Sequence, residues 1–113
     1  MKFETMEKDG AVVVSPKGRM MAGPDLDKIH EKIKELVDKG TRRMVMDLGE
    51  VDLMDSRGLG VLVAAFTSLK GVGGEMRLAR TTKKIQNLIV ITHLTTVFKS
   101  YDSVDEALKN FQN

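Results

Sequence analysis

The chain has 113 residues, 42% hydrophobic and 30% charged, a balance typical of one globular domain with a modest core. Its net charge is only +2, and its basic residues are spread along the chain without interleaved aromatics, so we expect no direct nucleic-acid binding. The lack of cysteine excludes disulfides and thiolate chemistry. The longest apolar run, residues 61–66, is too short to span a bilayer, and the first residues lack an apolar signal region. We therefore expect a cytoplasmic protein with no membrane contact.

The first segment has the pattern of a hairpin. Residues 2–7 and 11–15 are predicted strands, and Asp9-Gly10 between them favours a tight turn. Residues 16–19 are expected to lead into a loop over residues 20–24. In that loop Met20 and Met21 are apolar where no strand or helix period requires it, so they are candidates for a contact patch or for filling a gap in the core.

An amphipathic helix is predicted to follow the loop. Pro24 suits its first position, Asp25 and Asp27 complement the helix dipole, and Gly40 marks its end. Its apolar stripe has helical spacing and consists of Leu26, Ile29, Ile33, Leu36 and Val37.

The central stretch begins as a strand and ends as a helix. Residues 44–48 form an apolar run rich in Val and Met, bounded by two arginines and by Gly49, which predicts a buried strand. The helix that follows carries an apolar stripe of Leu59, Leu62, Phe66 and Leu69. From their i, i+4 spacing we expect Leu62 and Phe66 to be buried.

The remaining elements continue the alternation. Residues 75–78 and 97–101 are predicted strands, and residues 83–91 a helix that begins after a cap at Thr81 or Thr82. A closing helix follows the capping-box pair Ser103 and Glu106. The order β-β-α-β-α-β-α-β-α predicts one α/β domain over residues 1–113, with a central mixed sheet of about five strands and about four helices.

Asp55-Ser56 stands where the central helix must start, and two compatible interpretations apply. Asp and Ser are both favoured as N-caps, because a side-chain oxygen accepts from an unpaired backbone N–H. Ser56 is also a candidate for phosphorylation, because a phosphate at a helix N-terminus meets free N–H groups and the positive end of the dipole. Asp55 would oppose that phosphate by like-charge repulsion.

Other candidate chemistry is weak. Gly58-Leu59-Gly60 lacks the third glycine of a dinucleotide fingerprint, and we expect its glycines to let the helix approach the sheet closely. His30 and His93 form no metal or catalytic pattern, and His30 is expected to be solvated. Asp47, Asp52 and Asp55 could gather at a strand end and bind a cation, although such residues more often make turns and caps. We expect no cofactor and no metal.

The central motif resembles the signature of the STAS domain family, and within it the bacterial anti-sigma factor antagonists. The matching run is Val45-Met46-Asp47-Leu48, then Val51 to Gly60, in which the Asp-Ser-x-Gly-Leu-Gly turn is the specific part. The similarity continues through residues 73–78, 91–94, 97–98 and 101–108, and so covers nearly the whole chain.

The resemblance implies a non-enzymatic switch. Its serine, matching Ser56, is phosphorylated by a serine kinase that is also an anti-sigma factor, and a serine phosphatase resets it. The unphosphorylated form binds the kinase and releases the sigma factor. The partner surface would comprise Met20, Met21, Asp55, Ser56, Arg57, Gly58 and Leu59.

The chain departs from the family pattern at two positions. Met21 stands where an Asp is usual, and Arg57 where Ser, Thr or Ala is more common. These changes point to a partner different from the usual one. The alternatives are a scaffold or regulatory module in which Ser56 is only a cap, and a nucleotide-binding enzyme, which the absent phosphate loop disfavours.

Overall fold

The computed structural model describes residues 2–109 and 111, so residues 1, 110, 112 and 113 of the expected domain lie outside the described residues. The chain opens with the predicted hairpin, β1 (Lys2–Lys8) antiparallel to β2 (Ala11–Met20). Its turn residues, Asp9 and Gly10, have φ of 54° and 80°, as the tight turns of hairpins require.

β2 is longer than predicted, because the chain stays extended through Pro16 as far as Met20. On one side β2 pairs with β1 over residues 11–17. On the other side it pairs with β3 (Arg43–Asp47) over residues 12–14 and with β4 (Val51–Met54) over residues 18–20. Pro16 lies between these two ladders, where its missing N–H interrupts no hydrogen bond on that side.

The six strands found among the described residues form one mixed sheet in the order β1-β2-β3-β5-β6, with β4 attached to the end of β2. β5 (Glu75–Ala79) and the two-residue β6 (Ser100–Tyr101) are parallel to β3. β4 was not predicted as a strand. The predicted strand over residues 97–101 is reduced to β6, since the N–H groups of Val97 and Phe98 both donate to the Leu94 carbonyl in a turn.

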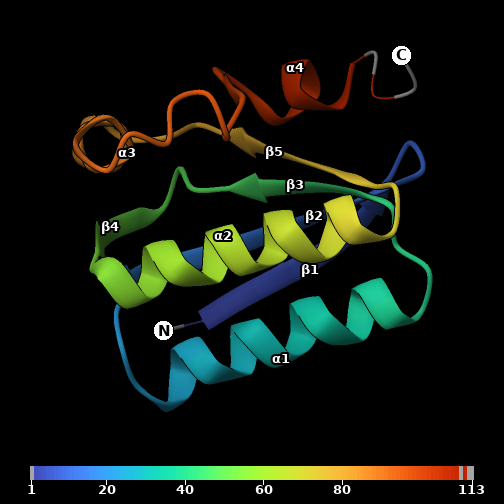
Figure 1. Ribbon diagram of the computed structural model, residues 1–113, viewed down its shortest axis with the longest axis horizontal. Helices are drawn as coiled ribbons and strands as arrows, with labels where there is room; N and C mark the ends of the chain where they lie inside the picture. The colour runs from blue at the N-terminus through green and yellow to red at the C-terminus, as the bar shows by residue number, and fades with distance from the viewer. Residues whose placement is uncertain (1, 110, 112–113) are drawn as a thin grey trace.

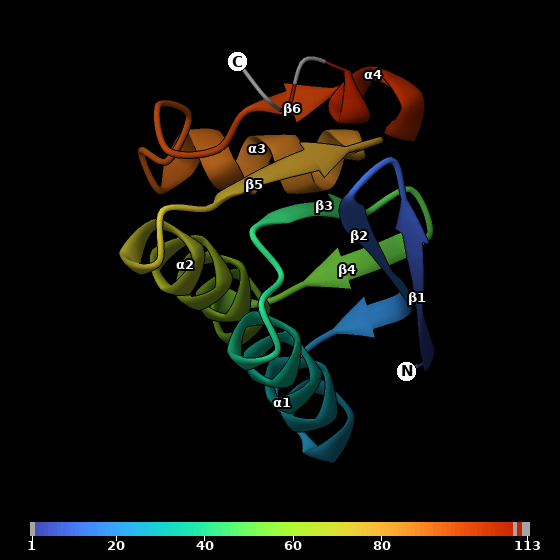
Figure 2. The same cartoon turned by 90° about the vertical axis from the view of Figure 1, so that its right-hand side faces the viewer.

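Three helices cover one face of the sheet. α1 (Pro24–Asp38) and α2 (Ser56–Gly71) lie side by side with their first residues at the same end, and α3 (Lys83–Ile91) packs on the same core (Figures 1 and 2). Within the described part of the chain, no helix combines the length and the apolarity needed to cross a membrane. With α4 (Val104–Leu108) on the other face, the described residues contain the four helices of the expected single α/β domain, which is confirmed, and one strand more than expected.

The main core lies between the sheet and these three helices. Leu62 is fully buried, as predicted. The prediction for Phe66 was wrong, because the residue packs at the margin of the core and is only half-buried. Its ring meets Phe98 edge-on at a centroid distance of 5.9 Å, and the Lys70 ammonium lies 5.9 Å from it.

A second, smaller core lies on the opposite face, under α4 (Val104–Leu108). Arg77 is buried there and its Nη1 donates to the carbonyl oxygens of Ala107 at 2.9 Å and Lys109 at 2.6 Å. Its guanidinium lies over the Phe111 ring at 4.2 Å, and its Nε donates to Glu75 at 2.8 Å. Arg77 therefore fixes the end of α4 to the sheet.

Candidate functional site

Asp55, rather than Ser56, is the N-cap of α2. It follows the last residue of β4 in an extended conformation, and its Oδ1 accepts the N–H of Gly58 at 2.8 Å. This bond satisfies one of the unpaired donors of the first helical turn. Ser56 is consequently the first residue of the helix, and its hydroxyl is not needed as the cap.

The second carboxylate oxygen of Asp55 connects the start of α2 to the loop before α1. Oδ2 accepts the N–H of Ala22 at 3.0 Å, while the backbone N–H of Asp55 donates to the carbonyl of Met20 at 3.3 Å. The hydrogen bonds from Ala22 and Gly58 hold the pKa of Asp55 below its ordinary value of 3.8. Asp55 is therefore a fixed anion that organises two segments.

Ser56 is exposed beside this anchored carboxylate. Among residues 2–109 and 111, no hydrogen-bond partner is found for its hydroxyl. Arg57, the next residue, is exposed as well. A hydroxyl at the first position of a long helix lies at the positive end of the dipole, where an added phosphate is stabilised.

Gly58 accounts for the close approach of the helix to the sheet that its sequence predicted. A Cβ atom at this position would overlap the Met20 carbonyl oxygen and lie 2.9 Å from Cγ of Met54. Gly58 is buried, and Leu59 is only 6% exposed. Gly58 has no side chain and that of Leu59 is largely buried, so we do not propose a side-chain contact with a partner at either position.

The two methionines of the predicted loop, Met20 and Met21, differ in position and in burial. Met20 is the last residue of β2 and pairs with Met54 of β4, so the prediction that it lies in a loop was wrong. Its side chain is fully buried, which supports the second alternative, that it fills the core, over a contact with a partner. Met21 follows the strand and is 41% exposed. Of the two, only Met21 stays a candidate for partner contact.

A groove of about 290 Å³ lies next to Ser56, between the first turns of α1 and α2. Its apolar floor includes Leu26 and Val61, both buried. Its remaining lining consists of Ala22, Gly23, Asp27, His30, Ser56, Arg57 and Gly60. His30 was expected to be solvated, but it is half-buried and faces this groove. No local pattern marked His30 or Gly60 as residues that line a groove, because the groove exists only where two helices meet. The expectation that Gly60 helps the helix approach the sheet was wrong, since a Cβ atom there would meet no described heavy atom within 4 Å beyond its own helix and chain neighbours.

Asp47, Asp52 and Asp55, which the sequence offered as a cation site or as turn and cap residues, have three different environments. Asp47 is buried, and its oxygens accept Nε and Nη2 of Arg80 at 2.8 and 2.9 Å. Asp52 is exposed, and Asp55 is bound by amides as described. In the described part of the chain, no three His, Cys, Asp or Glu side chains are placed to hold one metal ion.

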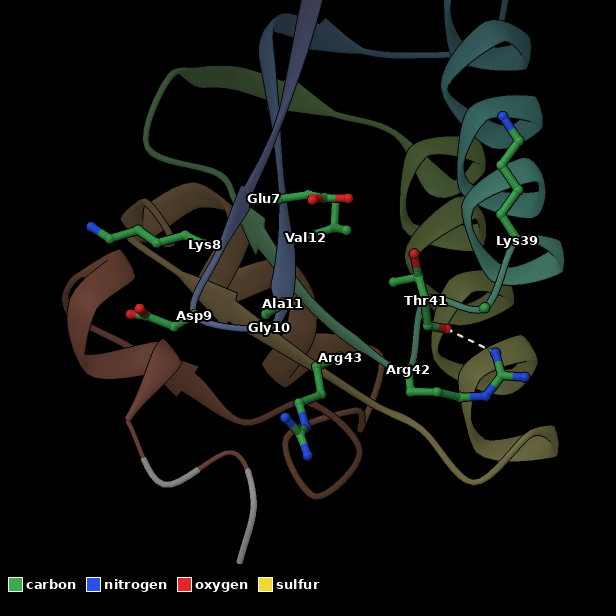
Figure 3. Close-up of a pocket in the computed structure, with 11 residues that line it drawn as sticks. Glu7, Lys8, Asp9, Gly10, Ala11, Val12, Lys39, Thr41, Arg42 and Arg43 are labelled. Atoms are coloured by element: carbon green, nitrogen blue, oxygen red, sulfur yellow. Dashed lines mark hydrogen bonds between the residues drawn. The ribbon is translucent and has the colours of Figure 1, made fainter.

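A larger hollow of about 630 Å³ lies at the opposite end of the molecule, between the β1–β2 turn and the loop after α1 (Figure 3). It is lined by cationic side chains, but those of Lys8, Lys39, Arg42 and Arg43 point in different directions. Lys8 and Lys39 also pair with Asp105 and Glu35. The hollow therefore lacks a converging set of groups for a ligand.

The site thus consists of an anchored acid, Asp55, and an exposed serine, Ser56, at the start of the central helix of a small α/β domain. The chain belongs to the STAS domain family, whose model matches residues 2–107. It is 33% identical over 78 residues to a TM1081 homolog from Thermotoga neapolitana, provisionally named an anti-sigma factor antagonist, with 69% of each chain covered. It is 28% identical to BtrV of Bordetella bronchiseptica, which carries the same provisional name, over 96% of this chain and 93% of that one.

A solved structure extends the comparison to the fold. The unphosphorylated form of the anti-sigma factor antagonist SpoIIAA superposes with a TM-score of 0.85 at 17% identity, covering 98% of this chain and 96% of that chain. This likeness shows the same arrangement of sheet and helices. The chain is thus a homologue of anti-sigma factor antagonists, a non-enzymatic family.

Proposed function

We propose that this chain is an anti-sigma factor antagonist controlled by phosphorylation of Ser56. In its unphosphorylated form it binds an anti-sigma factor that is also a serine kinase, and thereby releases a sigma factor. The kinase transfers a phosphate to Ser56 and so ends the interaction, and a serine phosphatase restores the binding form. These steps take place in the cytoplasm, where sigma factors act.

The observation that carries the proposal is the division of roles between two adjacent residues. Asp55 caps α2 and is held by two amides, so the exposed Ser56 hydroxyl is available to a kinase. A phosphate there adds about −1.5 to −2 charge. The helix N-terminus offsets part of this charge and Asp55 opposes it, so we expect the fold to change little.

Loss of binding follows from desolvation. A partner that covers Ser56 also covers the neighbouring carboxylate of Asp55, and a second adjacent anion would then be removed from water without a counter-charge. The interaction should therefore weaken steeply on phosphorylation while the melting temperature stays nearly constant.

The test measures affinity for the anti-sigma serine kinases of the source organism, each purified singly. Ser56→Ala should bind constitutively, Ser56→Asp should lose part of the affinity, and the phosphorylated chain most of it. Ser68→Ala is the matched control, since Ser68 is an exposed serine in the same helix. Equal affinities of the phosphorylated and unmodified chains would end the switch hypothesis and leave a scaffold or regulatory module.

A further inference from the structure

The first strand, β1, is an open edge of the sheet (Figure 2). Within the described part of the chain it pairs with β2 on one side, and no strand pairs with it on the other. All of its residues except Phe3 are exposed. At the other margin of the sheet, β6 has only two residues and offers little backbone to a further strand. β1 is therefore the edge at which a strand can be added.

Alternate residues of β1 direct their backbone groups toward this free edge. Lys8 and Ala11 flank the two-residue turn, and a pair in that position exchanges backbone hydrogen bonds. Hydrogen-bonded and non-hydrogen-bonded pairs then alternate along an antiparallel ladder. The even-numbered residues of β1 are therefore bonded to β2, and the N–H and C=O groups of Phe3, Thr5 and Glu7 face outward.

Two copies of β1 can pair antiparallel in few registers. Outward-facing residues of one copy must meet outward-facing residues of the other, so the pairing is symmetric about one residue. Registers that pair five or more residues of β1 are centred on Glu4, Thr5 or Met6. The first places Glu4 opposite Glu4 of the second copy. The second places Lys2 opposite Lys8 twice. Both registers are disfavoured, because like charges directly opposite one another are destabilising.

The register centred on Met6 brings opposite charges together instead. It places Glu4 of each copy opposite Lys8 of the other, so the favourable pair occurs twice. It also places the two Met6 side chains opposite each other, and Met6 is an apolar residue that is 53% exposed. These are non-hydrogen-bonded pairs, in which opposing side chains lie closest, while Thr5 and Glu7 exchange the backbone hydrogen bonds.

The ion pairs that β1 makes within one copy do not prevent this arrangement. Lys17 lies 3.6 Å from Glu4, and Asp105 lies 3.1 Å from Lys8. Both pairs are exposed and contribute little to stability, so Glu4 and Lys8 can turn to a second copy at small cost. Charges on an edge strand commonly prevent pairing. In β1 they oppose two registers and favour the third.

We propose that this chain forms a symmetric dimer in which the β1 strands of two copies pair antiparallel in the register centred on Met6. The two sheets become one, and the two-fold axis passes between the two Met6 residues. The dimer does not depend on a role for Ser56, because no residue of β1 lines the groove beside it or binds Asp55.

Sedimentation equilibrium of the full chain from about 1 μM to about 1 mM measures the dimer dissociation constant. Glu4→Lys and Lys8→Glu each put like charges opposite one another twice, so each should raise this constant at least about tenfold. An equimolar mixture of the two variants should restore dimers, because every pair then joins opposite charges. Glu7→Lys is the control: it makes the same charge change as Glu4→Lys in the same strand, but Glu7 lies opposite Thr5, so it should dimerise like the parent.

Thr5→Pro tests the backbone pairing. It removes an outward N–H that β2 does not use, so the monomer should stay folded by circular dichroism while the dimer is lost. If this variant does not fold, the charge variants decide. A parent that stays monomeric over the whole concentration range would overturn the proposal. So would a dimer that neither Glu4→Lys nor Lys8→Glu weakens, a mixture that fails to restore dimers, or a Glu7→Lys variant weakened as much as Glu4→Lys.

Discussion

The carboxylate of Asp55 accepts the backbone N–H of Ala22 at 3.0 Å, across 33 positions of the chain. The same side chain caps α2 through Gly58. The loop that leads into α1 and the turn that begins α2 are therefore held by one anion. Ser56 stands directly beside that anion, so the surface around it is defined before any partner arrives.

Removing this anion should loosen both segments. Asp55→Ala deletes both acceptors, whereas Asp55→Asn keeps one oxygen that can accept the Gly58 N–H. We expect melting temperatures to fall in the order parent, Asp55→Asn, Asp55→Ala. Hydrogen exchange should be faster at the amides of both Ala22 and Gly58 in Asp55→Ala. An unchanged rate at Ala22 would contradict the link between the two segments.

The same hydrogen bonds predict an acid-dependent loss of stability. The pKa of Asp55 in the folded chain lies below 3.8, because amides of Ala22 and Gly58 bind the ionised form. The unfolded chain then binds the proton more tightly, so the stabilisation is complete above about pH 3.8 and is lost as pH falls through the folded pKa.

Thermal unfolding of the parent and of Asp55→Asn, measured from about pH 7 down to about pH 2, tests this sign. The stability difference between the two should be constant at neutral pH and shrink only in the acid range. Asp25 and Glu35 also have lowered pKa values, but both proteins retain them and their effect cancels. A difference that shrinks first near neutral pH would contradict the assignment to Asp55.

Gly58→Ala should be destabilising because the added methyl group collides with the backbone at Met20. Backbone cannot rotate away as a side chain can, so we expect a loss of about 1–3 kcal/mol in the free energy of unfolding. Gly71→Ala in the same helix serves as the control and should cost nothing. Denaturant titration of both variants measures the difference, and equal stabilities would mean that the helix can shift freely.

Alanine substitutions of Met20 and Met21 should have opposite effects on stability and on kinase binding. Met20→Ala removes a fully buried side chain and should cost about 2–5 kcal/mol. Met21→Ala changes a side chain that is 41% exposed and should alter stability by no more than about 0.5 kcal/mol. We expect only Met21→Ala to weaken kinase binding in the fully folded chain. Unchanged binding would remove Met21 from the partner surface.

Leu62 and Phe66 should differ although they share one helical stripe. Leu62→Ala creates a cavity inside the main core and should cost about 2–5 kcal/mol. Phe66→Ala should cost less than this, because its ring is half-buried and solvent can replace part of its contacts. Unfolding of both variants in urea gives the comparison, and a larger loss for Phe66→Ala would contradict the burial of the two side chains described above.

The sequence allowed prediction of the elements whose signals are local. Hydrophobic spacing and capping residues located α1, α2 and α3, and Asp9-Gly10 located the hairpin. β4 was missed because its four residues pair with the end of β2, more than 30 positions earlier, and no local pattern records that pairing. The same distant ladder explains why Met20 is buried rather than in a loop.

The part of the site that depends on local sequence signals was predictable, and the part that depends on distant contacts was not. Capping chemistry and the family resemblance both pointed to Asp55-Ser56, and the cap itself is confirmed at Asp55. The amide of Ala22, the ring of His30 and the space over Gly60 come together only when α1 packs beside α2 (Figure 1). The spacing of residues in the sequence does not indicate these contacts between α1 and α2.

The fastening of α4 by Arg77 has a consequence for how this domain can diversify. α4 and its small core lie on the face of the sheet away from α1 and α2, and no residue of α4 lines the groove beside Ser56. Substitutions or attached modules on that rear face would leave the surface around Ser56 unaltered. Segments can thus be attached to the domain on this rear face without altering the surface around Ser56 that we propose as the switch.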